Sequence, residues 1–427
     1  MKPAPLMLAL ALLAGPAPAQ DNAAPAPEQH TLPDTLVADD PLAPAAEAVD
    51  GLRQSTLDQA NLEFNLGYTL IWQFADGADL VDQTNSLITG SYDFDGYWEA
   101  VPEDHGLGSG GLGWLVEGGH NIGHHRSEDF SANVGSGLGV NDDADPTTDI
   151  AITELWWQHT LGPVVNRRPR DVGKELTPEE LAALAEGEVR LITVTAGKID
   201  QTVFFDANRV ANDETAQFLS TPLVNSVAVA FPDNGVGLNV WVQPREWFYV
   251  TAGFGDANAV ASHGPDDFEA DELFWAAELG FSPEIEGLGP GNYRFMVWTT
   301  EFDNGAGGTD DGAGFSLSFD QEVMPGVIPF FRYSHGDDDV LDFEHMIEGG
   351  VGFENLLQNE DLLGVGYVHA EPSDPALDDE SILEVFYRVR VTDTLEVTPA
   401  VQAVFDPVAN PNQDTVVIGA IRAQFTF

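Results

Sequence analysis

Five arginines in the second half of the chain alternate with apolar residues, so they share one face of the extended segments that carry them. If the apolar face contacts lipid, the guanidinium groups face a water-filled lumen. Guanidinium groups in such a place bind and orient polar solutes through charge and hydrogen bonds, without catalysis. We therefore predict a basic wall at the narrowest part of a pore, formed by Arg294, Arg332, Arg388, Arg390 and Arg422.

Carboxylates take the same phase in the first half of the chain. A basic wall opposite an acidic one creates a transverse field, which selects solutes by size and charge. The stability of the barrel alone also explains why the charged residues take inward positions, because a cation that faces lipid at the middle of the membrane costs about 2–4 kcal/mol. It does not explain why the arginines gather in one half. The predicted acidic residues are Glu63, Asp93, Asp95 and Glu154.

The elements that carry these charges have a period of two. Residues 62–72 alternate apolar and polar side chains over a length that suits a tilted strand crossing a bilayer, which needs about 9–11 residues. Residues 415–427 repeat the pattern and end on Phe427. Turn-forming residues separate the segments. The sixteen predicted strands lie near 62–72, 86–99, 110–118, 150–160, 188–199, 235–243, 247–255, 272–281, 291–303, 312–321, 327–335, 344–355, 361–369, 380–391, 395–406 and 415–427.

Connection lengths favour an all-β fold, a transmembrane antiparallel β-barrel of sixteen strands. Bacterial barrels have even strand numbers, short periplasmic turns and longer outer loops. An even number of strands with the N-terminus in the periplasm is obtained only if residues 200–234 form one outer loop. The short apolar run 225–231 is then not a strand.

The N-terminus predicts export. Residues 1–19 contain Lys2, an apolar core and the Ala17-Pro-Ala19 cleavage pattern, and are predicted as a signal peptide. Residues 20–60, rich in Ala and Pro, are predicted as a flexible periplasmic leader, and 61–427 as the barrel. A short helix is predicted at 177–186, where Thr177 precedes Pro178.

The charge balance excludes some partners. The chain has 16 basic and 71 acidic residues, a net charge of -55, and no cysteine. Such a surface repels nucleic acid, and thiol chemistry is impossible. Hydrolase and nucleotide fingerprints do not occur. We predict no catalysis, cofactor or metal, although His120, His124 and His125 have spacing compatible with a metal site and acidic loops such as 337–339 could hold Ca²⁺ weakly.

One stretch resembles a known family. Residues 196–209, a Gly-Lys strand end followed by a loop rich in Phe, Asp and Asn, and the Pro-Asp-Asn-Gly turn at 232–235 resemble the OprB-type carbohydrate-selective porins. The resemblance implies an outer-membrane channel for small sugars whose loop folds inward to narrow the pore. The implied constriction residues are Asp200, Phe204, Phe205, Asp206, Asn208, Arg209, Asp213, Glu214 and Gln217.

Several alternatives stay open at this stage. The phenylalanines could pack the loop against the barrel wall instead of contacting sugar rings. The acidity of this chain departs from the family pattern and would also suit a general or cation-preferring porin. Less favoured are an outer-membrane barrel enzyme and a soluble protein that binds polysaccharide. The expected partners are small sugars and outer-membrane lipid, with no nucleic acid, and the barrel is expected as a monomer or a homotrimer.

Overall fold

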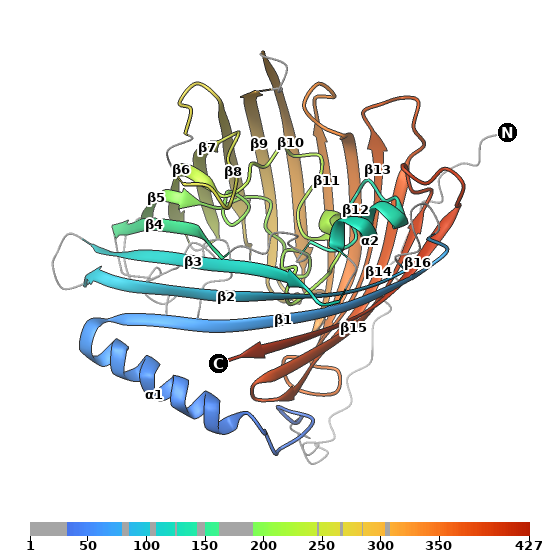
Figure 1. Cartoon of the computed structure of the whole chain (residues 1–427). Helices are drawn as coiled ribbons and strands as arrows, with labels where there is room; N and C mark the ends of the chain where they lie inside the picture. Colours follow the sequence, from blue (N-terminus) through green and yellow to red (C-terminus); the bar gives the residue numbers. More distant parts are fainter. Residues whose placement is uncertain are drawn as a thin grey trace, which may run out of the picture. The chain divides into compact units, whose positions relative to one another are not determined.

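Sixteen antiparallel strands close into a barrel in the part of the chain that this computed structural model describes (Figure 1). Each strand pairs with its neighbours in sequence, and β16 pairs with β1 from Gly67↔Thr426 to Asp76↔Val417. The described residues are 32–78, 85–102, 108–123, 126–142, 150–161, 191–245, 247–264, 268–283, 285–303 and 308–427. The strands are β1 Leu62–Asp76, β2 Ser86–Val101, β3 Ser109–Asn121, β4 Ala151–Leu161, β5 Leu191–Ile199, β6 Gly235–Arg245, β7 Phe248–Asp256, β8 Leu273–Phe281, β9 Gly291–Asp303, β10 Thr309–Gln321, β11 Val327–Gly336, β12 Phe343–Glu354, β13 Leu362–Pro372, β14 Glu380–Thr392, β15 Leu395–Phe405 and β16 Thr415–Thr426.

The barrel prediction is confirmed, strand by strand. Each predicted segment overlaps one observed strand, with ends that differ by a few residues. Residues 200–234 contain no strand, only the short 3-10 helix η3 at Thr221–Leu223, so the apolar run 225–231 was correctly left out of the count.

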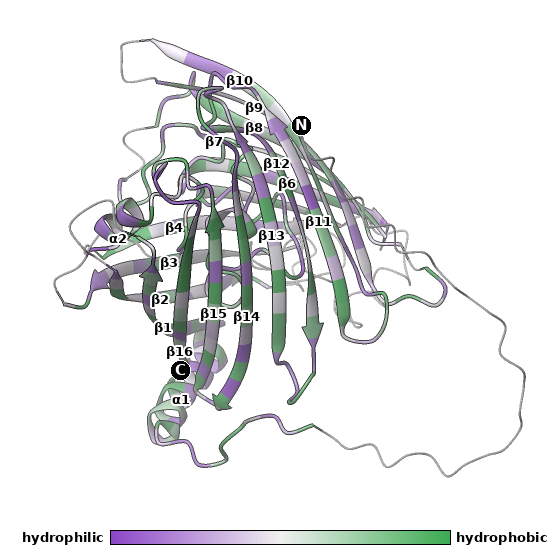
Figure 2. Cartoon of the chain, turned by 90° about the vertical axis from the view of Figure 1, so that its right-hand side faces the viewer, coloured by the Kyte–Doolittle hydropathy of each residue, from purple (hydrophilic) through white to green (hydrophobic). Residues whose placement is uncertain are grey.

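The outer face of the barrel is apolar and exposed. Figure 2 shows hydrophobic and hydrophilic residues alternating along strands such as β14 and β15. Soluble monomers rarely expose a continuous band of large apolar side chains, whereas lipid-facing strands require one. The five tryptophans expected at membrane interfaces are all exposed, by 38–49%: Trp72, Trp98, Trp157, Trp247 and Trp275. None of the described helices is long and apolar enough to span a membrane.

Two α-helices accompany the strands. Helix α1 (Ala43–Ala60) precedes β1, and α2 (Ser127–Val134) lies between β3 and β4. The prediction of a flexible leader was therefore wrong for residues 43–60. Helix α1 begins at Ala43-Pro44, where proline is tolerated, and ends at Asn61, whose φ of 52° stops the helix. The predicted signal peptide and the predicted helix at 177–186 lie outside the described residues.

The segment around α1 is fixed to one end of the barrel. The amides of Leu36 and Val37 donate to the carbonyls of Arg390 and Val391, at 3.1 and 2.8 Å. Arg53 donates to the carbonyl of Phe64 (2.9 Å) and to that of Phe427. Helix α1 thus contacts both strands of the β1–β16 seam.

Candidate functional site

The loop 200–234, which follows β5, folds into the barrel. Figure 1 shows this green segment inside the ring of strands. Its contacts include inward residues of β8, β10, β11, β12, β14 and β16, on the strand positions that alternate with the exposed apolar ones. The inward loop that the family resemblance implied is therefore present, and its anchors can be described one by one.

Arg332 on β11 holds the first half of the loop. Its Nε lies 3.1 Å from Asp206 Oδ2, and its Nη1 lies 2.7 Å from Glu348 Oε2. Its Nη2 donates to the carbonyls of Asp206 and Ala211, each at 2.9 Å. The side chains of Arg332, Asp206 and Glu348 are fully buried, so the positive charge of Arg332 is what compensates the burial of the two carboxyl groups beside it.

A second set of anchors holds the loop around Arg209. Asp320 pairs with Arg294 at 2.9 Å and also accepts from the Arg209 amide at 3.4 Å. The Arg209 guanidinium bridges Glu322 at 3.1 Å and Glu354 at 2.9 Å. Glu322 and Glu354 lie at the ends of β10 and β12 that are remote from the start of the loop, so the loop reaches deep into the barrel.

The second half of the loop is held by β14 and β16. Arg422 donates to the carbonyls of Glu214 (2.7 Å) and Gln217 (2.9 Å). Glu384 accepts from the amides of Leu219 (2.8 Å) and Ser220 (2.9 Å). Arginine thus binds loop carbonyls and glutamate binds loop amides, which satisfies backbone groups that would otherwise be buried without partners.

The loop phenylalanines pack against apolar inward residues. Phe204 and Phe205 are 2% and 0% exposed. Phe218 packs edge-on against Phe386 of β14, with ring centroids 4.8 Å apart. Their faces are covered, which is the packing alternative raised by the sequence; a direct role in sugar binding for Phe204 and Phe205 has no support in this geometry.

A second inward segment, residues 126–142 around α2, packs beside the loop. Glu380 accepts from the Gly137 amide at 3.0 Å and also binds the Ser136 hydroxyl. The Asp142 amide donates to the Leu219 carbonyl at 2.8 Å and so joins the two segments. This element was not predicted from the sequence, because its Gly- and Ser-rich composition gives no periodic signal.

Most of the basic wall that was predicted from the sequence is covered by the loop. Arg294, Arg332 and Arg422 are inward as expected, but they are 3%, 0% and 0% exposed beneath the loop. They hold the constricting element and do not face water. Arg388 and Arg390 stay partly exposed near one end of β14, where both pair with Glu396, at 3.7 and 3.3 Å.

Of the carboxylates predicted on the inward face, the two on β2 are more exposed than the one on β4. Asp93 and Asp95 are half-buried, and their cross-strand partners on β1 are Gly67 and Asn65, which belong to the inward phase. Glu154 is 3% exposed and accepts from the Trp156 indole at 3.1 Å. Glu63 is half-buried in the same phase.

The remaining loop residues fall into two groups. Asn208 is buried and donates weakly to Ser318 at 3.3 Å. Asp200 and Asp213 cap turns of the loop, binding Thr202 and Thr215. Of the nine loop residues predicted at the constriction, the five that are partly exposed are Asp200, Arg209, Asp213, Glu214 and Gln217.

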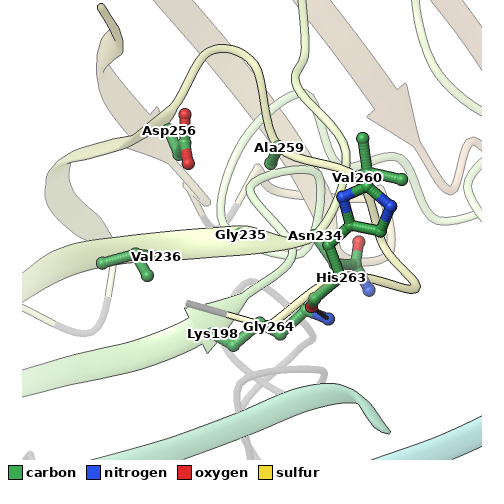
Figure 3. A pocket seen from close by; sticks show the side chains of 9 residues that line it. All are labelled: Lys198, Asn234, Gly235, Val236, Asp256, Ala259, Val260, His263 and Gly264. Atoms are coloured by element: carbon green, nitrogen blue, oxygen red, sulfur yellow. Dashed lines mark hydrogen bonds between the residues drawn. The ribbon is translucent and has the colours of Figure 1, made fainter. Parts of the chain in front are cut away.

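Lys198 lies beside a small pocket where β5 ends and β6 begins (Figure 3). Its ammonium group donates to the carbonyls of Ile152 (2.9 Å) and His263 (2.7 Å) and to that of Ala261. Its neighbours across the sheet are Leu155 and Val236, which are not in the inward phase. We assign this pocket a structural role at the rim and no part in the pore.

A closed antiparallel barrel with an apolar outer face and an inward loop defines the protein as a porin-type outer-membrane channel. A sequence profile of the family described as "Carbohydrate-selective porin, OprB family" matches residues 120–427. The chain belongs to this family.

Individual proteins are also similar to this chain. The high-pH structure of Pseudomonas putida OprB superposes with a TM-score of 0.68 and 14% identity over 89% of this chain and 97% of that one, which shows the shared fold. A protein described as uncharacterized from Aquifex aeolicus is 27% identical over 56% of this chain and 67% of its own length. The porin AaxA of Chlamydia caviae is 22% identical over 55% of this chain, and the match spans 53% of that porin.

Proposed function

We propose that this porin admits small carbohydrates by passive diffusion, through the part of the lumen that the loop 200–234 leaves open. The supporting observation is the loop itself, which is held against the inner wall by the buried Arg332–Asp206 pair, by the ion pairs of Arg209 and by hydrogen bonds to Arg422 and Glu384. A constriction fixed in this way selects by size without a gate. Signal-peptide export of residues 1–19 and the absence of catalysis are part of the same proposal.

Two sets of polar side chains are placed to contact a solute. One set is on the loop and includes Arg209, Glu214 and Gln217, which are partly exposed. The other is the pair Asp93 and Asp95 on β2. Carboxylate, amide and guanidinium groups bind sugar hydroxyls through hydrogen bonds, which replace bonds to water at little net cost.

A cation preference is the second candidate. Asp93 and Asp95 are water-accessible and inward, whereas three of the five arginines expected to face them are buried. The transverse field predicted from the sequence is therefore weighted toward negative charge. A lumen of this sign attracts cations and leaves neutral sugars unaffected by charge.

Reconstituted protein separates the two candidates. Liposome swelling is measured with glucose, a disaccharide and neutral amino acids, and reversal potentials are measured in a KCl gradient. Faster swelling with sugars than with amino acids of equal size supports carbohydrate passage. Swelling that follows size alone, with a strong cation preference that Asp93→Asn and Asp95→Asn together abolish, would assign the channel to cations.

A further inference from the structure

Two histidines face each other at the rim of the barrel, outside the pore. His335 on β11 and His345 on β12 are cross-strand partners, and their rings stack with centroids 4.2 Å apart and planes at 15°. Both belong to the outward phase, because Arg332 and Ser334, which alternate with His335, are buried on the inner side. His335 is the penultimate residue of β11 and His345 is near the start of β12.

Glu344 completes a set of three possible ligands. His335, Glu344 and His345 each offer one ligand atom, and these atoms lie within 4.8 Å of one another. All three residues are half-buried. The register shift between Phe343 and His345 places Glu344 in a bulge, which allows it to lie beside residues of the outward phase.

Hydrogen bonds prepare the imidazoles for coordination. His335 Nδ1 lies 3.0 Å from the carbonyl oxygen of Glu344. A carbonyl only accepts, so Nδ1 carries the proton and the neutral ring keeps the lone pair of Nε2. His345 Nδ1 lies 3.3 Å from the Tyr333 hydroxyl. Metal-bound histidines commonly have such partners on their second nitrogen, which fix the ring orientation.

We propose that His335, Glu344 and His345 form a binding site for a divalent metal ion of the Zn²⁺ class. Two imidazoles and one carboxylate suit Zn²⁺, whereas Ca²⁺ and Mg²⁺ require oxygen ligands. Three protein ligands leave a fourth position for water. A bound ion joins the ends of β11 and β12 and thereby restrains the loop 337–342 between them. This site is independent of the proposed transport function.

The chain provides a matched control histidine. His369 on β13 is the cross-strand partner of Ile347, so it shares the outward phase with His345. Its Nδ1 lies 2.9 Å from the Ser381 hydroxyl, and it is not part of the three-ligand set. A second control comes from the acidic loop residues 337–339, which could attract an ion without histidine.

Calorimetric titration of the purified, detergent-solubilised porin with ZnCl₂ tests the site. We expect one Zn²⁺ per chain, at least tenfold weaker binding for His335→Gln, His345→Gln and Glu344→Gln, and unchanged binding for His369→Gln. A hundredfold excess of Ca²⁺ leaves the titration unchanged. Each variant is first shown to be folded by its heat-modifiable migration in gels.

Two results would overturn the proposal. One is the absence of stoichiometric Zn²⁺ binding to the unmodified chain. The other is Zn²⁺ binding that persists in the His335→Gln/His345→Gln double variant but is displaced by Ca²⁺, which would assign the ion to residues 337–339.

Discussion

Arg332 on β11 and Asp206 in the inward loop form an ion pair in which neither side chain is exposed, with Nε and Oδ2 3.1 Å apart. Because the same guanidinium also binds Glu348 and two loop carbonyls, one strand residue fixes both the position and the backbone path of the loop. The width of the channel therefore depends on a residue that solutes do not contact.

Replacing Arg332 by methionine is expected to release the loop. The substitution leaves Asp206 and Glu348 buried without a cation, which costs about 3–5 kcal/mol. The loop then leaves the wall, and single-channel conductance rises with larger fluctuations. Planar-bilayer recording measures this, with Arg245→Gln as the control, since Arg245 is exposed at the end of β6. Unchanged conductance in a folded Arg332→Met barrel would contradict the anchoring role.

Replacing Arg422 by glutamine is expected to loosen only the second half of the loop. The arginine makes two charge-assisted hydrogen bonds to the carbonyls of Glu214 and Gln217. Losing one such bond costs about 1.5–3 kcal/mol, and the first half of the loop keeps its own anchor, the buried pair of Arg332 and Asp206. Swelling rates for disaccharides are expected to rise while those for small sugars stay unchanged. Protease accessibility of residues 213–220 provides a second readout.

Asp361, in the turn between β12 and β13, is expected to make this turn sensitive to acid. Burial raises the pKa of Asp361, but hydrogen bonds from the Tyr387 hydroxyl and from the amides of Leu356, Leu357 and Gln358 outweigh burial and lower the pKa below its usual range. A lowered pKa stabilises the fold at pH values above that of the unfolded carboxyl, about 3.9, and the stabilisation is lost as pH falls through the folded pKa.

The corresponding experiment compares thermal unfolding between pH 7 and pH 3. Asp361→Asn is expected to lower the transition temperature at pH 7. The difference in transition temperature between this variant and the unmodified protein is expected to become smaller as the pH falls. Asp378→Asn, at an exposed carboxylate of an outer loop, controls for general charge effects. Parallel curves for Asp361→Asn and the unmodified protein would refute the prediction.

Arg53→Ala is expected to weaken the β1–β16 seam. Arg53 joins α1 to the carbonyls of Phe64 and Phe427, one on each side of the seam. We expect a lower temperature for the shift between folded and unfolded migration in gels, and unaltered conductance at room temperature. Gln54→Ala is the control, because the Gln54 side chain donates to Asp58 of the same helix.

The strands were predictable because their signal is local. The alternation along 62–72 or 415–427 is imposed by lipid on one side of the strand and water on the other. The requirement for an even number of strands then decides on which side of the membrane each connection lies. Helix α1 was missed because its Ala- and Pro-rich composition also suits a disordered leader; only the docking of Arg53 and Leu36 on the barrel distinguishes the two.

The site was predictable only in outline. Period two places Arg332 and Arg422 inward, but it does not say whether the inward side contacts water or a folded loop. That depends on which carboxylates and carbonyls the loop brings to them, a tertiary relationship with no local pattern. His335 and His345 escaped notice for the same reason, since only the register of β11 with β12 makes them neighbours.

The contacts between Arg422 and the loop have a consequence for biogenesis. The guanidinium donates to Glu214 and Gln217, which precede it by 208 and 205 residues. The loop is therefore made long before β16, the strand that supplies its last anchor. Until β16 is in place, the loop lacks the anchor that Arg422 provides, whereas Arg332 on β11 and Glu384 on β14 precede β16 in the chain. The final strand therefore closes the barrel and completes the anchoring of the loop in the same step.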